Sequence, residues 1–351
     1  MKQNNKLSIF LTFVLCAALC GGLFLLERDA SDYILRIARL CAINLVLALS
    51  MNLINGYTGL FSLGQAGFMA IGAYVTALFT IPVAKKQMIY MITPLISPLD
   101  EMILPFVVAL IIGGLLAAGA AFLVGIPCLR LRGDYLAIAT LGFSEIIRVL
   151  ITNAQSLTNG AQGLKSIPPN ATLWWCFGVA FVLIVGMGLL VTSSYGRALE
   201  AIREDEIAAE AMGIALFKHK MMAFMISAFI AGVGGGLLAA YNGTIGPDMF
   251  RVTQTYNVLM IVVMGGMGSI SGSVIAAFLV TIGQEWLRVL DGPIHIGFIQ
   301  TQGVAGMRMV VFSALLLVVI LFFRNGLMGT RELSWNALLS RFSKRKEVSA
   351  P

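Results

Sequence analysis

Few residues of this chain have the chemistry that a catalytic centre requires. Only two of the 351 residues are histidines, and the five cysteines have no C-x-x-C spacing. These counts exclude most His-ligated metal centres and indicate neither a zinc site nor a disulfide framework. The sequence also lacks G-x-x-x-x-G-K-[ST], the loop that cradles nucleotide phosphates. We therefore expect a non-catalytic chain that binds no metal or cofactor of its own.

Two ionisable side chains lie inside one apolar stretch, residues 135–152. Glu145 and Arg148 are three residues apart, which places them on one face of a helix and close enough to pair. An ionisable group within a bilayer costs at least about 2.5 kcal/mol, so each needs a partner or water. The pair fits either a structural or snorkelling role, or a role in gating a solute pathway.

A second polar group is interleaved with glycines over residues 52–74. Each interior glycine costs a helix about 1 kcal/mol relative to alanine, so a continuous helix is disfavoured here. Either the helix is discontinuous and lines a solute path, or small residues allow close packing with side-chain amides bonded between helices. The candidate pathway residues in this segment are Asn52, Asn55, Gly59, Ser62, Gly64, Gln65 and Gly67.

Composition places these residues in a membrane. The chain is 58% hydrophobic and 12% charged, about half of the ~25% charge usual in soluble domains. Apolar runs near the length of a bilayer crossing predict an all-α, polytopic helix bundle with about 8–10 spans, some of them glycine-broken or re-entrant. The predicted runs are 7–26, 34–54, 59–81, 103–127, 135–152, 173–192, 221–241, 255–282 and 309–323.

The run 255–282 is too long for one ordinary span. Glycines at its centre predict two half-helices or a re-entrant pair, with one long tilted helix as the alternative. The candidate gating residues at this break are Gly265, Gly266, Gly268 and Ser269. Glu285 is expected outside this segment.

The distribution of charge indicates the orientation of the chain. With the break, both termini and most Lys and Arg residues fall on the cytoplasmic side. The net charge of +7 therefore indicates orientation rather than nucleic acid binding.

The loop 193–220 is the longest charged one. Its composition predicts one helix of about 24 Å from Arg197 to Met212, ended by Gly213. A stripe of small and apolar residues on it fits either docking into a partner's groove or a solvated connector. The candidate docking residues are Arg197, Ala201, Ile202, Arg203, Glu204, Asp205, Glu206, Ala208, Ala209, Met212 and Gly213.

Residues 1–330 form one predicted transmembrane domain, and 331–351 form a tail with an interfacial helix followed by disorder.

Four blocks then resemble one family. Residues 44–78, 133–150, 193–214 and 262–277 are similar to the signature stretches of the permease subunit of branched-chain amino acid ABC importers. The resemblance implies a bacterial inner-membrane subunit, with the 197–213 helix as its coupling helix. It also implies a second related permease, two cytoplasmic ATPases that bind ATP and Mg²⁺, and a periplasmic solute-binding protein. Related permeases serve urea or short amides, and an ion-coupled carrier or channel is a further alternative.

Overall fold

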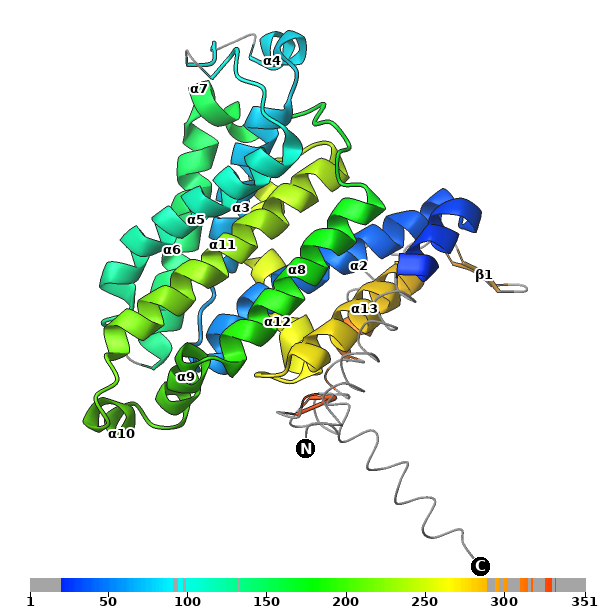
Figure 1. The fold of residues 1–351 in the computed structure, drawn as a ribbon. Coiled ribbons are helices and arrows are strands. Elements are labelled where there is room, and N and C mark those ends of the chain that lie inside the picture. Colours follow the sequence, from blue (N-terminus) through cyan, green and yellow to red (C-terminus); the bar gives the residue numbers. More distant parts are fainter. Residues whose placement is uncertain are drawn as a thin grey trace, which may run out of the picture.

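The computed structural model describes residues 20–90, 94–96, 99–131, 133–288, 294–296, 299–301, 310–314, 317, 326–329 and 332. Apolar helices dominate this part of the chain (Figure 1). The strands are β1 (Ile294–Ile296) and β2 (Ile299–Thr301), which pair antiparallel with Ile296 opposite Ile299. The prediction of an all-α membrane bundle is confirmed, with this short hairpin as the one departure among the described residues.

The longer helices follow the predicted apolar runs closely. They are α2 (Asp32–Met51), which continues into the π-helix η1 (Asn52–Tyr57), α3 (Gln65–Thr80), α5 (Phe106–Cys128), α6 (Asp134–Asn153), α8 (Leu173–Thr192), α11 (Leu216–Asn242), α12 (Val252–Gly265) and α13 (Ile270–Trp286). The shorter ones are α4 (Val83–Ile89), α7 (Gln155–Thr158), η2 (Gly160–Gln162), α9 (Ser194–Glu204), α10 (Glu206–Ala211) and η3 (Pro247–Phe250).

Five helical segments in the described part are long and apolar enough to cross a membrane. They are Asp32–Tyr57, Phe106–Cys128, Asp134–Asn153, Leu173–Thr192 and Leu216–Asn242, and the pair α3 and α4, bent by 120°, would make a sixth. The predicted runs 7–26 and 309–323 lie largely outside the described residues, as does the interfacial helix predicted over 330–342. The count of 8–10 spans therefore stays a prediction.

The structure corrects one span and confirms another. Residues 59–64 are not helical, so the continuous span predicted over 59–81 is wrong. Helix α3 alone has 16 residues and is about 24 Å long, shorter than a ~30 Å hydrocarbon core. The predicted break within 255–282 is confirmed, because α12 ends at Gly265 and α13 begins at Ile270.

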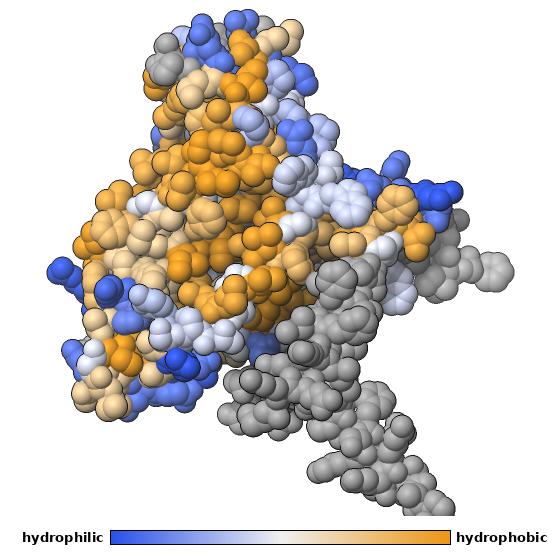
Figure 2. Space-filling model, viewed as in Figure 1, coloured by the Kyte–Doolittle hydropathy of each residue, from blue (hydrophilic) through white to orange (hydrophobic). Residues whose placement is uncertain are grey.

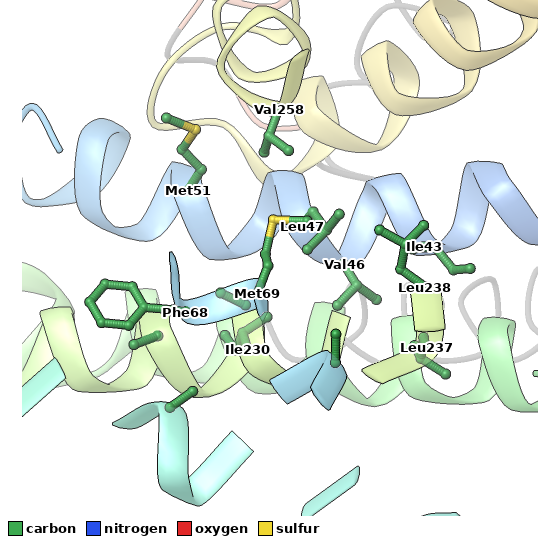
Figure 3. Packing of buried hydrophobic residues seen from close by; sticks show 14 of the residues in the cluster. Ile43, Val46, Leu47, Met51, Phe68, Met69, Ile230, Leu237, Leu238 and Val258 are labelled. Atoms are coloured by element: carbon green, nitrogen blue, oxygen red, sulfur yellow. The ribbon is translucent and has the colours of Figure 1, made fainter. Parts of the chain in front are cut away.

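Helices α2, α3, α5 and α11 form the packed centre. Figure 3 shows Leu47, Met69, Ile230 and Val258 among the buried side chains that α2, α3, α11 and α12 contribute. Glycines allow the backbones to approach closely: a Cβ added at Gly72 would lie 2.0 Å from the Gly232 carbonyl oxygen. Small residues at helix contacts are typical of membrane bundles, where van der Waals packing replaces the hydrophobic effect between helices.

The polar ends of the bundle are well separated. Helices α9 and α10 lie at one end and α4 and α7 at the opposite end (Figure 1). Between them Figure 2 shows a broad hydrophobic band with hydrophilic residues gathered above and below it. Many large apolar side chains of α5, α6 and α8 are exposed on these helices, including Leu123, Ile138 and Leu189. This arrangement is that of a multi-pass membrane protein, whose lipid-facing side chains are apolar.

Candidate functional site

Two interrupted helices meet beside α9. One interruption is η1 with the non-helical residues that follow it, and the other is the link from α12 to α13; we call residues 52–64 and 266–269 together the double break. The Asn52 side chain joins the two. Its Nδ2 donates to the Ser269 carbonyl oxygen and to Ser273 Oγ, both at 2.9 Å, and its Oδ1 accepts from the Gly268 backbone N–H at 2.8 Å. One buried amide thus satisfies backbone groups that the interruption frees.

The double break requires glycine at several positions. A Cβ added at Gly56 would lie 2.4 Å from the Gly268 backbone nitrogen and 1.9 Å from Asn52 Oδ1. Gly266 and Gly268 have φ values of 109° and 87°, which L-residues with a side chain rarely adopt. The two chain segments can therefore touch and turn here only because these side chains are absent. The predicted residue Gly265 is also closely packed, against the Gly272 carbonyl group.

The other polar candidates of the segment 52–67 are likewise bonded within the chain. The Ser62 backbone N–H donates to Asn55 Oδ1 at 3.2 Å, and Gln65 Nε2 donates to Ser50 Oγ. Ser50 Oγ in turn donates to the Ser227 carbonyl oxygen of α11 at 2.6 Å. Gly64 and Gly67 pack against α6, where an added Cβ would meet Thr140 and Ser144. The helix is therefore discontinuous, and its amides bond within the chain, as the packing interpretation expects. That the break lines a solute path stays a prediction.

The predicted helix from Arg197 to Met212 is in fact two helices. Asp205 adopts an extended backbone, with φ −157° and ψ 112°, and separates α9 from α10. Its Oδ1 accepts the backbone N–H groups of Ile207 at 2.8 Å and Ala208 at 3.0 Å. A carboxylate that caps the N-terminus of a new helix outweighs the modest propensity to continue the old one. Gly213 follows α10 with φ 84°, so its predicted role at the helix end is confirmed.

The break at Asp205 changes which residues of this hairpin are exposed. Ile202 and Ala209, predicted on the docking stripe, are only 2% and 3% exposed because they pack against the chain itself. Ile207 and Met212 are 80% and 84% exposed. Ala208 is exposed, as are Arg197, Glu204 and Asp205, while Ala201, Arg203 and Glu206 are half-buried. Ile207 is absent from the predicted stripe because an unbroken helix would place it on another face.

Arg203 links α9 to the double break. Its Nη1 donates to the Gly56 carbonyl oxygen at 3.0 Å, while its Nη2 lies 2.9 Å from Glu204 Oε1. A Cβ added at Gly59, where φ is 71°, would lie 2.7 Å from Arg203 Cγ, and one added at Gly268 would lie 2.7 Å from Nη1. One side chain of α9 therefore contacts both parts of the double break. The sequence identified Arg203 as a docking residue but did not predict this contact.

Glu332, in the predicted tail, is a further residue at this place that sequence reasoning missed. Its carboxylate accepts the backbone N–H groups of Ile270 at 2.6 Å and Ser271 at 3.1 Å, at the start of α13. The Tyr57 hydroxyl donates to it at 2.9 Å. A carboxylate is stabilised at a helix N-terminus by the free N–H groups and the helix dipole. Glu332 thus holds α13 and η1 together.

The predicted pair on α6 is confirmed. Arg148 Nε lies 2.7 Å from Glu145 Oε2, with side chains 25% and 34% exposed respectively. The pair contacts no part of the double break through a hydrogen bond within the described residues.

Among all the residues that the structure describes, no group of three or more His, Cys, Asp or Glu side chains is placed to hold a metal ion.

An apolar bundle with interrupted helices and an exposed helical hairpin defines a multi-pass membrane protein. The family model for the permease component of branched-chain amino acid transport systems matches residues 33–321. This chain therefore belongs to that family, and the resemblance found in the sequence is confirmed.

Named relatives agree with this assignment. The high-affinity branched-chain amino acid transport system permease protein LivM of Escherichia coli K12 is 37% identical over 298 residues, covering 75% of this chain and 64% of the relative. A probable branched-chain amino acid transport permease protein LivM of Methanocaldococcus jannaschii is 25% identical over 254 residues, covering 64% and 72%. The chain thus spans slightly less than two thirds of the Escherichia coli relative. No solved structure matches it significantly.

Proposed function

We propose that this chain is the permease subunit of an ATP-driven importer of branched-chain, hydrophobic amino acids in a bacterial inner membrane. The observation that carries the proposal is the family match over residues 33–321, together with the exposed α9–α10 hairpin that contacts the double break through Arg203. The chain has no phosphate-binding loop of its own. Its energy would come from partner ATPases that bind ATP and Mg²⁺.

The proposed assembly has four further protein subunits. A second, related permease would complete the pathway, two cytoplasmic ATPases would drive it, and a periplasmic binding protein would deliver the solute, with lipid around the apolar helices. Both termini of this chain would be cytoplasmic. Ile207, Ala208 and Met212 form the apolar surface of the hairpin that an ATPase groove would cover, because large exposed apolar side chains in one place mark interaction sites.

The same hairpin offers a direct route for coupling. Glu206 Oε1 lies 2.6 Å from Lys220 Nζ, which fixes α10 to the start of α11, and Arg203 fixes α9 to η1. When the ATPases close, a displacement of the hairpin would reach the double break through Arg203 and the core through α11. A rigid link of this kind passes on motion because it has few alternative arrangements.

Reconstitution tests the function. The chain is co-purified with its partner permease, ATPases and binding protein, placed in liposomes, and assayed for uptake of labelled leucine, with urea as competitor. We expect uptake that requires ATP and the binding protein and that urea does not reduce. Uptake by this chain alone, driven by an ion or solute gradient, would overturn the proposal in favour of a carrier or channel.

One variant pair tests the docking surface. Ala208→Trp adds bulk to an exposed position on α10, and Gln155→Trp adds the same bulk to an exposed position on α7 at the opposite end. We expect Ala208→Trp to abolish ATPase binding or coupled uptake, while Gln155→Trp leaves both unchanged. Equal behaviour of the two variants would mean that the hairpin is a solvated connector.

A further inference from the structure

A cavity of about 630 Å³ lies at the end of the bundle opposite the α9–α10 hairpin. It is partly open and is lined by the middle of α2, the last turns of α11 and α13, η3, the first three turns of α12 and the short helical stretch 310–314. We call it the distal cavity. Its volume is within the range of about 300–1,000 Å³ that small-molecule sites occupy. None of the pathway candidates chosen from the sequence lines it.

The lining combines two kinds of surface. Aliphatic, thioether and aromatic side chains form most of the wall: Leu40, Leu238, Met249, Met260, Ile261 and Phe312. Amides and one carboxylate are set among them: Asn44, Asn242, Gln254, Asn257, Gln284 and Glu285. A mostly apolar wall with a few polar groups is the usual composition of a small-molecule site.

Most of these polar groups are free to bind. Within the described part of the chain, the side chains of Asn242, Gln254, Asn257 and Gln284 make no hydrogen bond, and Asn44 uses only its Nδ2, which donates to Thr281 Oγ1 at 2.9 Å. Glu285 lies 3.4 Å from the exposed Arg288 and is 19% exposed. The sequence predicts Glu285 outside the run 255–282, but the structure places it in the last turn of α13. Amide groups without a partner in the protein are available to bond to water or to a solute.

We propose that the distal cavity is the place where this permease receives its solute, an α-amino acid with an aliphatic side chain. The Glu285 carboxylate would accept the solute's ammonium group, the amide N–H groups would donate to its carboxylate, and the apolar wall would hold its side chain. An ion or urea would leave that wall unused. The inference rests on the proposed function and deepens it by assigning the residues that contact the solute.

The position of the cavity supports this role. Val258 and Ile261 of α12 are buried and form its floor, and Gly265, where α12 ends at the double break, is only four residues beyond Ile261. That separation is about 6 Å along a helix. Movement of the double break would therefore shift α12 and open the floor toward the α9–α10 end.

Cysteine modification in the complete importer tests the proposal. Asn257→Cys and, as the control, Asp248→Cys each place a thiol near the same end of the bundle, but only Asn257 lines the cavity. The assembled complexes are treated with a bulky, membrane-impermeant maleimide, so folding is complete before the change is made. We expect leucine uptake of the labelled Asn257→Cys importer to fall at least tenfold, while its ATP hydrolysis and the labelled control keep their rates.

Two outcomes would overturn the assignment. One is labelled Asn257→Cys importer with unchanged uptake, and the other is a thiol at 257 that does not react. Both leave ATP-driven uptake by the wild-type importer intact, whereas failure of the proposed function would abolish that uptake. As a second measurement, Glu285→Gln should lower leucine uptake about tenfold, the loss of one charge-assisted hydrogen bond, and Glu285→Asp should restore part of it. Asp248→Asn is the matched control.

Discussion

Asparagine and glutamine side chains gather at two levels of this bundle, and the two groups differ in what their amides contact. At the double break, Asn52 uses both its donor and its acceptor on the backbone and side chains of the opposite segment. In the distal cavity, Asn257 and Gln254 make no side-chain hydrogen bond within the described residues. The first group holds the chain together, while the second is available to a solute.

The comparison separates structural from transport roles along one helix. Helix α12 lines the cavity with its first three turns and ends at the double break. A polar residue at the break should therefore affect stability first, because a buried amide that loses its partner costs about 1–3 kcal/mol. A polar residue of the cavity should affect uptake and leave stability almost unchanged. Four predictions test this division, beginning with the largest effect.

Gly56→Ala should cause the largest loss of stability. Its Cβ would overlap Asn52 Oδ1 and the Gly268 nitrogen, both of which are fixed by other contacts, so the two segments must separate. We expect a destabilisation of more than about 3 kcal/mol or failure to assemble, as for severe overpacking. Gly246→Ala, near the cavity end, has no atom within 4 Å of its added Cβ and serves as the control. Thermal unfolding of the purified complex would measure both, and equal midpoints would contradict the close packing.

Asn52→Leu should destabilise by about 2–3 kcal/mol. The substitution keeps the branched shape of the side chain, although leucine is larger, and leaves the buried Gly268 N–H without its acceptor. Asn52→Asp keeps an acceptor for that N–H yet loses both donated bonds, so its effect tells which half of the amide matters. The measurement is the detergent-solubilised melting temperature. A stable Asn52→Leu variant with defective uptake would instead put Asn52 in the pathway.

Arg203→Ala should cost about 1–2 kcal/mol and uncouple ATP hydrolysis from uptake. It removes a charge-assisted hydrogen bond to the Gly56 carbonyl oxygen and the contacts with Gly59. Arg251→Ala, at the opposite end, removes a pair with Asp248 whose side chains are 59% and 73% exposed, so its effect should stay below about 1 kcal/mol. The ratio of ATP hydrolysed to leucine imported is the readout. An unchanged ratio in Arg203→Ala would exclude Arg203 as the link.

The sequence predicted the elements whose causes are local. The apolar run 173–192 is α8 (Leu173–Thr192), and α6 differs from its prediction by one residue at each end, because length and hydropathy decide where a membrane helix lies. The glycines of residues 265–268 also revealed the break between α12 and α13. Glu145 and Arg148 pair as their spacing requires.

What the sequence could not predict depends on contacts between distant residues or on competing local bonds. Asn52 and Gly268 are 216 positions apart, so nothing near Asn52 distinguishes a pathway residue from a bonded one. Asp205 stands in a sequence that favours helix, and the break appears only when its carboxylate is counted as a cap for Ile207 and Ala208. The apolar run ends before Glu285, so hydropathy predicts this residue outside the helix, although α13 continues to Trp286.

Asn257→Leu is the variant with the smallest predicted change in stability, and it gives the most direct test of the difference between the cavity and the double break. Asn257→Leu replaces an exposed amide with an apolar side chain of the same branching, and the structure shows no side-chain bond within the described residues that the change would break. Its unfolding free energy should stay within about 0.5 kcal/mol of wild type, as for surface substitutions. Leucine uptake should nevertheless fall, because a donor for the solute's carboxylate is gone. Asn52→Leu makes the same chemical change at the double break. It should show the reverse pattern, with a large loss of stability. If both variants lose stability equally, the free amides of the cavity have partners in the assembled importer, and the cavity is an interface rather than a solute site.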